Sequence, residues 1–405
     1  MPHDLPLIST IAMGLGLAFV CGMIASRLRL PPLVGYLIAG VVVGPFTPGF
    51  VANPHIAAEL AEIGVILLMF GVGMHFSFRD LMAVKSIAIP GAIGQIAVAT
   101  AMGVGMTRLL GWTLGGGIVF GLALSVASTV VLLRALEARN AVTSPDGRIA
   151  VGWLIVEDLA TVLVLVLLPA LAGAFHGNAT ADPAELAMAM GGTFLKIAIF
   201  IALMVFAGIR LLPRLLDRVA AGPWQELFTL SVLAIALGIA FGASKLFGVT
   251  FALGAFLAGV VVNASDHSHR AAEETRPISD AFGALFFVSV GMLFNPAILV
   301  EQPLAVLATV VIIIIGKSVV AYSILRLCRR PHGTALFVSA SLAQIGEFSF
   351  ILANLGLGLK LLPPEGNDLL MASALISITL NPLVFKLVER FGLTPFTLAE
   401  RETVH

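Results

Sequence analysis

Apolar residues fill this chain in long runs, and polar residues gather in the short stretches between them. Each run is about 20 residues long, the length that an α-helix needs to cross roughly 30 Å of hydrocarbon. Strand-like alternation is absent, which argues against a transmembrane barrel. The pattern predicts an all-α membrane protein with thirteen membrane-spanning segments, here called spans, at 5–26, 32–46, 57–76, 84–109, 113–138, 146–172, 185–213, 224–243, 247–264, 276–294, 303–325, 332–358 and 368–390.

The composition agrees with this pattern. Hydrophobic residues make up 59% of the 405 residues and charged residues only 11%, whereas a soluble domain has about 25% charged residues. A net charge of zero gives no sign of nucleic-acid binding. Cys21 and Cys328 have no motif spacing, so packed thiols are the simplest interpretation. The first span lacks the basic start and cleavage site of a signal peptide, and we expect it to be retained.

Basic residues are distributed unevenly among the connections between spans. Eighteen Lys and Arg residues fall in or beside the connections after odd-numbered spans, and three fall in those after even-numbered spans. Cytoplasmic connections collect Lys and Arg. We therefore expect a multi-pass protein of a bacterial inner membrane, with a periplasmic N-terminus and a cytoplasmic C-terminus.

Three pairs of short sequences repeat in order at one spacing. The sequence GYLIAGVVVG at 35–44 is similar to GAFLAGVVVN at 254–263, FGVGMHF at 70–76 to VSVGMLF at 288–294, and SPDG at 144–147 to PPEG at 363–366, with offsets of 219, 218 and 219. An odd number of crossings separates equivalent spans, so the second copy is predicted to be inverted, as in many transporters. The predicted parts are a first repeat at 1–175, a linker helix at 176–222, a second repeat at 223–392 and a cytoplasmic tail at 393–405.

Few ionisable residues lie deep inside the spans, where a charge costs roughly 2.5–3.5 kcal/mol on insertion scales. Adjacent acids, Glu157 and Asp158, lie in span 6, Lys317 in span 11 and Glu347 in span 12. Neighbouring helix residues point about 100° apart, so Glu157 and Asp158 cannot face one partner. One interpretation is a structural Glu157–Lys317 ion pair that joins spans 6 and 11. No second deep base is then left for Asp158.

A buried carboxylate such as Asp158 can hold a proton or, when ionised, a hard alkali cation, and alternation between the two amounts to cation/proton exchange. Other oxygen ligands must converge on such a cation, and broken helices supply them in transporters. Ser and Thr residues in the spans have an alternative role, which is to hydrogen-bond to carbonyl oxygens of their own helix. Glu347 is equally explained as a structural or charge-compensating acid. The candidates at matching depth in spans 5 and 12 are Ser125, Ser128, Thr129, Gln344 and Glu347.

Six segments in this order resemble one transporter family: PLVGYLIAGVVVGP, ELAEIGVILLMFGVGMHF, LSVASTVVLLRALE, WLIVEDL, LFFVSVGMLF and SLAQIGEFSFIL. Together they are similar to the second monovalent cation:proton antiporter family, and within it to Kef-type potassium/proton antiporters of the YbaL-like branch. The resemblance implies the sodium/proton antiporter fold, a homodimer, a mobile six-helix core domain, and crossed discontinuous helices at spans 5 and 12.

The resemblance also implies roles for single residues. The family's ion-binding aspartate falls on Asp158, and the basic residue of span 11 in electrogenic relatives falls on Lys317. The position before the aspartate is glutamine in glutathione-gated members and aspartate in electrogenic sodium antiporters, but it is Glu157 here, which leaves stoichiometry and ion choice open. Kef-type members continue into a cytoplasmic domain that binds nucleotide or glutathione, so we expect the native protein to extend beyond this chain.

The leading hypothesis is a K⁺/H⁺ antiporter that works by elevator-like alternating access and needs no cofactor beyond its ions. If Lys317 neutralises Glu157 throughout, exchange is one for one. A Na⁺/H⁺ antiporter of the same fold is the first alternative. A potassium channel is less favoured because a TVGYG-type filter is absent, and a sodium/organic-anion symporter does not need these acids. An intramembrane enzyme is least favoured because no HExxH-like spacing appears.

Overall fold

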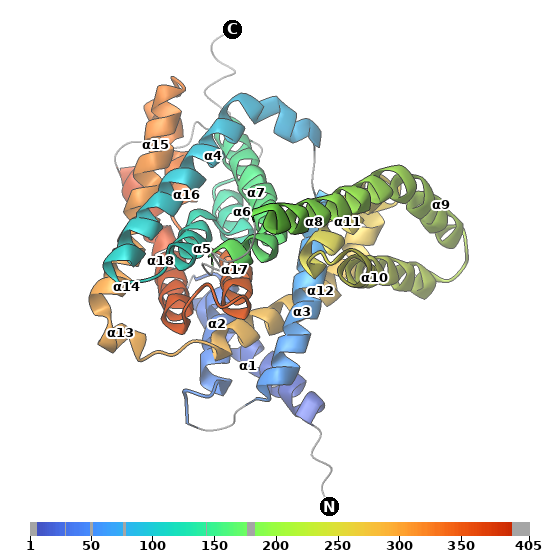
Figure 1. Cartoon of the computed structure of the whole chain (residues 1–405), viewed down its shortest axis with the longest axis horizontal. Helices are drawn as coiled ribbons and strands as arrows, with labels where there is room; N and C mark the ends of the chain where they lie inside the picture. The colour runs from blue at the N-terminus through green and yellow to red at the C-terminus, as the bar shows by residue number, and fades with distance from the viewer. Residues whose placement is uncertain are drawn as a thin grey trace, which may run out of the picture. The chain divides into compact units, whose positions relative to one another are not determined.

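The computed structural model describes residues 6–28, 30–48, 52–75, 78–142, 144–175 and 183–390, and within these ranges the regular structure is helical (Figure 1). Each predicted span contains a helix or a pair of helices. Eight helices of the described part are long and apolar enough to cross a membrane, whereas α2, α5, α11 and α17 are shorter apolar helices. The count of thirteen crossings therefore stays a prediction. The predicted tail at 393–405 and the start of the predicted linker, 176–182, lie outside the described residues.

The chain forms two compact units, each assembled from both halves of the sequence. Unit 1 comprises Met1–Ala25, Gly35–Phe76 and Val162–Leu293, and unit 2 comprises Ser26–Val34, Ser77–Thr161 and Phe294–His405. The main helices of unit 1 are α1 (Pro6–Arg27), α2 (Pro32–Val43), α3 (Pro54–His75), α8 (Pro183–Leu203), α9 (Ile209–Ala220), α10 (Gln225–Gly242), α11 (Phe251–Asn263) and α12 (Ser268–Met292). Those of unit 2 are α4 (Phe78–Leu109), α5 (Leu114–Ser125), α6 (Thr129–Glu137), the greater part of α7 (Pro145–Phe175), α13 (Ile298–Glu301), α14 (Pro303–Val311), α15 (Lys317–Leu327), α16 (His332–Ser341), α17 (Glu347–Gly358) and α18 (Pro364–Arg390).

Two helix crossings in unit 1 depend on glycine. Gly40 of α2 meets Gly291 of α12, and a Cβ added at Gly40 would lie 2.1 Å from the Val288 carbonyl oxygen. Gly259 of α11 meets Gly73 of α3, and a Cβ added at Gly259 would lie 2.1 Å from the Phe70 carbonyl oxygen. Because glycine has no Cβ, the backbones of both helix pairs can approach this closely.

The N-terminal part of α12 corrects one expectation. Span 10 is predicted to begin at 276, with the charged stretch before it as a connection, but the helix begins at Ser268. Arg270 and Glu274 form an i,i+4 ion pair 2.7 Å long between Nε and Oε1. Such pairs stabilise a helix on its polar surface. The charged sequence before 276, which lies outside the predicted span, therefore forms the first turns of α12.

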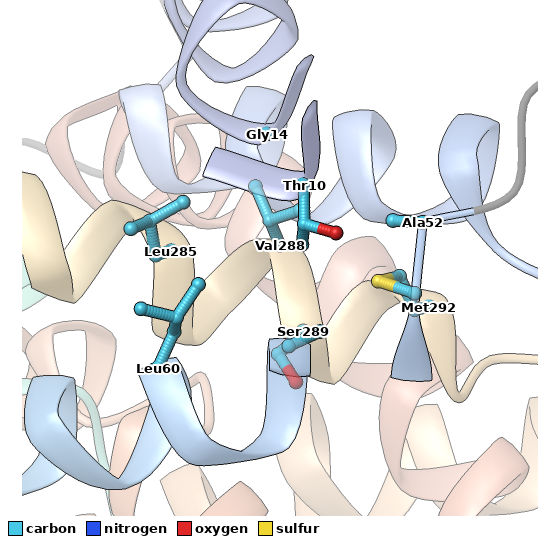
Figure 2. A pocket seen from close by; sticks show the side chains of 9 residues that line it. Thr10, Gly14, Ala52, Leu60, Leu285, Val288, Ser289 and Met292 are labelled. Carbon is cyan, nitrogen blue, oxygen red and sulfur yellow. The ribbon is translucent and has the colours of Figure 1, made fainter. Parts of the chain in front are cut away.

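Unit 1 also contains a small cavity between α1, α3 and α12 (Figure 2). Its lining is mostly apolar, with Leu60, Leu285 and Met292 among the contributors, and the hydroxyl groups of Thr10 and Ser289 are its polar members. The Thr10 hydroxyl accepts a hydrogen bond from the Asn53 backbone N–H at 3.4 Å. None of the residues that line the cavity is charged.

Two of the predicted spans in unit 2 are interrupted at the centre. Span 5 consists of α5 and α6 with residues 126–128 between them, and span 12 consists of α16 and α17 with residues 342–346 between them. Helix α5 packs against α4 and α17, and α15 packs against α16 and α4. The two interruptions lie where the sequence suggested helix breaks, and they position the candidate site.

Candidate functional site

The two interruptions meet each other directly. The Ser128 backbone N–H donates to Gln344 Oε1 at 2.8 Å, and Gln344 Nε2 donates to the Ser128 carbonyl oxygen at 3.2 Å. Gly346 lies against Ser128 so closely that an added Cβ would be 2.2 Å from the Ser128 Cβ. The Gln344 side chain therefore pairs the Ser128 N–H and is a second donor to its carbonyl oxygen, which also accepts from the Leu132 N–H at 3.0 Å, in agreement with the rule that buried backbone groups are paired.

Glu347 lies at the start of α17, beside the start of α6. Its Oε2 accepts a hydrogen bond from Ser128 Oγ at 2.8 Å, and its side chain is buried. The N-terminus of a helix carries a partial positive charge. A carboxylate at this place compensates that charge, which is one of the two roles that the sequence left open for Glu347.

Asp158 extends from the middle of α7 and is 5% exposed. Thr129 Oγ1 donates to Asp158 Oδ2 at 3.2 Å, whereas Oδ1 is buried and has no hydrogen-bond partner among the described residues. Two further buried acids, Glu347 and Glu157, act electrostatically on Asp158. A buried carboxylate oxygen without a partner is energetically costly, so this oxygen is the position at which a cation or a proton is most needed.

Glu157, the preceding residue of α7, has a different environment and is 0% exposed. Gln95 Nε2 donates to Glu157 Oε1 at 2.6 Å, and Trp153 Nε1 donates to the same oxygen at 3.1 Å. The Ala127 backbone N–H donates to Oε2 at 3.0 Å. Three N–H donors thus fix Glu157: one from α4, one from the preceding turn of α7 itself, and one from the first helix break.

Lys317 starts α15 directly after a π-helical turn at Ile312–Gly316 and is fully buried. Its Nζ donates to the Gln344 carbonyl oxygen at 3.0 Å. The ion pairs within 4.0 Å in the described part of the chain involve other side chains, so the direct Glu157–Lys317 pair considered from the sequence is not formed. The positive charge of Lys317 still acts on Glu157, and its ammonium group stabilises the carbonyl end of the second helix break.

The hydroxyl of Ser125 is hydrogen-bonded within its own helix, whereas those of Ser128 and Thr129 reach Glu347 and Asp158. The Ser125 hydroxyl donates to the Leu122 carbonyl oxygen at 2.7 Å. This is the hydrogen bonding within the helix that the sequence analysis gave as the alternative for Ser and Thr residues. The structure therefore brings together Asp158, Thr129, Ser128, Gln344 and Glu347, with Glu157 and Lys317 held beside them by separate hydrogen bonds.

Gln95 and Trp153 are site residues that the sequence analysis missed. Both are 0% exposed, and both donate to Glu157. A signal for Gln95 was present, because it is the one amide in the apolar stretch IAIPGAIGQIAVAT of span 4. Trp153 lies four residues before Glu157, which places the two on one face of a helix.

This arrangement is suited to binding a small monovalent ion. In the described part of the chain, Asp158 has one carboxylate oxygen without a partner, and a Thr hydroxyl from the start of α6, next to the first helix break, donates to the other. Two further acids, Glu347 and Glu157, act on it. Hard oxygen ligands suit alkali and alkaline-earth cations, and transporters use broken helices for this purpose.

Comparison with known proteins agrees with this chemistry. Residues 15–388 match the model of the sodium/hydrogen exchanger transmembrane family, and the chain belongs to that family of cation/proton antiporters. It is 61% identical over 99% of its length to YbaL of Escherichia coli K12, which is named as a cation/proton antiporter, and spans 72% of that protein. It is 33% identical over 95% of its length to K(+) efflux antiporter 4 of Arabidopsis thaliana, and spans 64% of that protein.

A solved structure supports the fold. The sodium proton antiporter MjNhaP1 from Methanocaldococcus jannaschii, determined at pH 8, superposes with a TM-score of 0.71 at 16% identity, over 95% of this chain and 98% of that one. At this identity the likeness establishes the fold alone. The expected all-helical antiporter fold and the resemblance to Kef-type antiporters are confirmed, and the relatives are transporters and not enzymes.

Proposed function

We propose that this chain is a secondary antiporter that exchanges cytoplasmic K⁺ for external H⁺, and that Asp158 holds the two ions in turn. The observation that carries the proposal is the environment of Asp158: a buried carboxylate with one free oxygen, one hydroxyl donor and no basic partner among the described residues. Thr129, Ser128, Gln344 and the backbone of the two breaks supply the remaining polar groups around the ion.

The choice of K⁺ rests on the relatives. A protein named as a K⁺ efflux antiporter is 33% identical over nearly the whole chain, whereas the named sodium antiporter is 16% identical. A Na⁺/H⁺ antiporter with the same site is the alternative. A potassium channel is disfavoured because no basic residue in the described part of the chain pairs with Asp158 and holds it permanently charged.

Alternating access by movement of one unit is supported by the division of the chain. The candidate ion ligands and Glu347 all belong to unit 2, which takes helices α4 to α7 from the first half of the chain and α13 to α18 from the second. An elevator mechanism would carry the site across the membrane as one body. We further propose a homodimer in a bacterial inner membrane, with a periplasmic N-terminus as the basic residues indicate.

Inverted repeats are supported by equivalent contacts. Gly259 is the repeat equivalent of Gly40, at an offset of 219, and Gly291 is the equivalent of Gly73, at an offset of 218. Gly40 packs against Gly291 and Gly259 packs against Gly73, so the same contact is made twice between equivalent positions. Ser128 and Glu347, also related by 219, form a hydrogen bond with each other. Contacts between equivalent positions are expected where a pseudo-two-fold axis passes.

The proposal is tested by ion exchange in proteoliposomes. Proton efflux from vesicles is followed on addition of K⁺, Na⁺, Li⁺ or Rb⁺ in turn, over a pH series. Wild-type protein is expected to respond to K⁺, and Asp158→Asn to lose the response because an amide cannot exchange a proton for a cation. Asp146→Asn is the matched control, since Asp146 lies at the start of the same helix and accepts a hydrogen bond from Thr334 at 2.8 Å.

Each other outcome is informative. A response of wild-type protein to Na⁺ alone would replace K⁺ with Na⁺ at the same site. Cation flux without proton movement would indicate a channel. Exchange that survives in Asp158→Asn would remove the proposed mechanism.

A further inference from the structure

A row of arginines follows α9 at the end of one membrane-spanning segment. Helix α8, a π-helical turn at Met204–Gly208 and α9 are continuous, and Leu195–Ala220 within them is long and apolar enough to cross a membrane. Three exposed arginines lie in α9 four residues apart, at Arg210, Arg214 and Arg218. Residues four apart lie on the same face of a helix. The apolar segment therefore ends in one continuous basic face.

These arginines are not neutralised by acids in the described part of the chain. The ion pairs found there involve other basic residues: His55, Arg139, His267, Arg270 and Arg276. Asp217, the acid of α9 itself, lies 3.3 Å from His267 Nε2 between Oδ1 and that nitrogen. The row thus carries positive charge that the described protein does not compensate.

Two of the guanidinium groups are held along the helix. Arg210 Nη1 donates to the Phe206 carbonyl oxygen at 2.8 Å, and Arg214 Nη1 donates to the Arg210 carbonyl oxygen at 2.7 Å. A guanidinium has five N–H donors, so most of the donors of each group remain for a ligand. The planar fork of arginine matches the paired oxygens of a phosphate group.

Exposed apolar side chains border the arginines. Leu211 and Leu215 each follow an arginine in sequence and are 62% and 41% exposed, whereas Leu216, on the side of α9 opposite the arginines, is buried. Trp224, in the connection that follows α9, is 60% exposed, and tryptophan is enriched where hydrocarbon meets the headgroups. A ligand that fits this face has an anionic head and apolar chains.

We propose that this face of α9, formed by Arg210, Leu211, Arg214, Leu215 and Arg218, binds an anionic phospholipid. The arginines hold the headgroup phosphate, and the leucines lie against the acyl chains. A zwitterionic headgroup brings a positive charge of its own, so the row favours a headgroup of net negative charge. A second copy of the chain would have to bring several acids to the same row. The inference depends on the membrane setting of the family, and it is independent of which ion is carried.

The test measures which lipid lies beside α9. Leu211→Trp places a fluorescent reporter on the face, and the same protein without this substitution supplies the background signal. The protein is reconstituted in vesicles of phosphatidylglycerol and phosphatidylcholine, of which one lipid at a time carries bromine on its acyl chains to quench tryptophan. At equal mole fraction, brominated phosphatidylglycerol is expected to quench the reporter more than brominated phosphatidylcholine, and the excess should shrink as salt screens the charges.

A triple variant in the Leu211→Trp background, Arg210→Gln/Arg214→Gln/Arg218→Gln, removes the row. A basic residue near a membrane surface increases attraction to anionic lipid by about 5-fold, so the preference for phosphatidylglycerol should fall at least 5-fold. Arg214→Gln alone should lower it in the same direction, and it provides the test if the triple variant does not fold.

The matched control removes the same charge elsewhere. Arg326→Gln/Arg329→Gln/Arg330→Gln alters three exposed arginines at and beyond the end of α15, which are not spaced by helical turns. In the same background this variant should leave the preference of the reporter unchanged.

Several outcomes would overturn the inference. Equal quenching by the two lipids before any arginine is changed would show that the face does not select anionic lipid. An equal loss of preference in the two triple variants would assign the effect to general surface charge. Absence of quenching by either lipid would show that protein, such as a second copy of the chain, covers the face. Failure of K⁺/H⁺ exchange would refute the proposed function and leave this test unchanged.

Discussion

Substitution of Gly346 by alanine should separate the two helix breaks. The backbone of Gly346 is extended, with φ of −146°, so alanine meets no conformational barrier there, and its effect comes from space. The new Cβ would lie 2.2 Å from the Ser128 Cβ and 2.4 Å from the Ser128 Cα, whereas ordinary contact begins at 3.4 Å. The two segments must therefore move apart by about 1.2 Å, the difference between 3.4 and 2.2 Å.

The magnitude follows from what that displacement disturbs. Overpacking of this kind costs about 1–3 kcal/mol. The movement also strains the Ser128 N–H bond to Gln344 and the Ser128 Oγ bond to Glu347, each 2.8 Å long, and a lost hydrogen bond costs about 0.5–1.5 kcal/mol. A misplacement of about 1 Å at a reacting site lowers a rate by about 100-fold, so we expect exchange to fall by one to two orders of magnitude.

The assay combines thermal stability in detergent with K⁺/H⁺ exchange in proteoliposomes. Gly358→Ala, at the other end of the same helix, is the matched control because a Cβ there meets nothing within 4 Å. Gly346→Ala should melt at a lower temperature than Gly358→Ala and exchange more slowly. If the two variants melt together and Gly346→Ala exchanges at the wild-type rate, the close meeting of the breaks is not the structure on which transport depends.

Three further predictions address other parts of the molecule. Lys317→Met should destabilise the protein by about 1–3 kcal/mol, because it leaves the buried Gln344 carbonyl oxygen without its charged donor. Denaturant unfolding measures this. The exposed Lys245→Met should cost much less, so equal effects would contradict the role of Lys317. Gly40→Ala and Gly259→Ala should lower the melting temperature by similar amounts, since each adds a Cβ 2.1 Å from a carbonyl oxygen. Gly238→Ala is the control, because its Cβ meets nothing within 4 Å. Unequal losses in the first two variants would argue against equivalent helix crossings. Glu274 precedes predicted span 10. Burial raises its pKa, but hydrogen bonds from Thr229 and Arg270 outweigh burial and hold that pKa below its ordinary value of 4.5. The stability that Glu274 contributes is therefore present above pH 4.5 and is lost as the pH falls through the lowered pKa. Melting temperatures of wild type and Glu274→Gln, measured from pH 6 to pH 3, should converge on acidification, and a constant difference would contradict this.

The sequence predicted those parts of the site that depend on the cost of burying charge. Asp158 stood out because no second deep base was left for it, and the structure leaves one of its oxygens without a partner in the described part of the chain. The helix breaks were predicted at the polar residues of mid-depth in spans 5 and 12, and both interruptions are present.

The contacts that depend on how helices cross were not predictable in this way. One interpretation of the sequence paired Lys317 with Glu157, but Lys317 donates to the Gln344 carbonyl oxygen, within the break at 342–346. Gln95 carries no charge, so a search for buried charges passes over it, although it makes the shortest bond to Glu157. Which donors reach a buried acid is decided by packing between spans, and spacing along one chain does not contain that information.

The central claim is that a proton and a cation exclude each other at Asp158. The most direct measurement is proton release in a lightly buffered detergent solution when K⁺ is added to purified protein. Wild-type protein is expected to release one proton for each K⁺ that binds, and Asp158→Asn to release none. Binding of K⁺ to wild type without proton release, or unchanged release by Asp158→Asn, would contradict the claim.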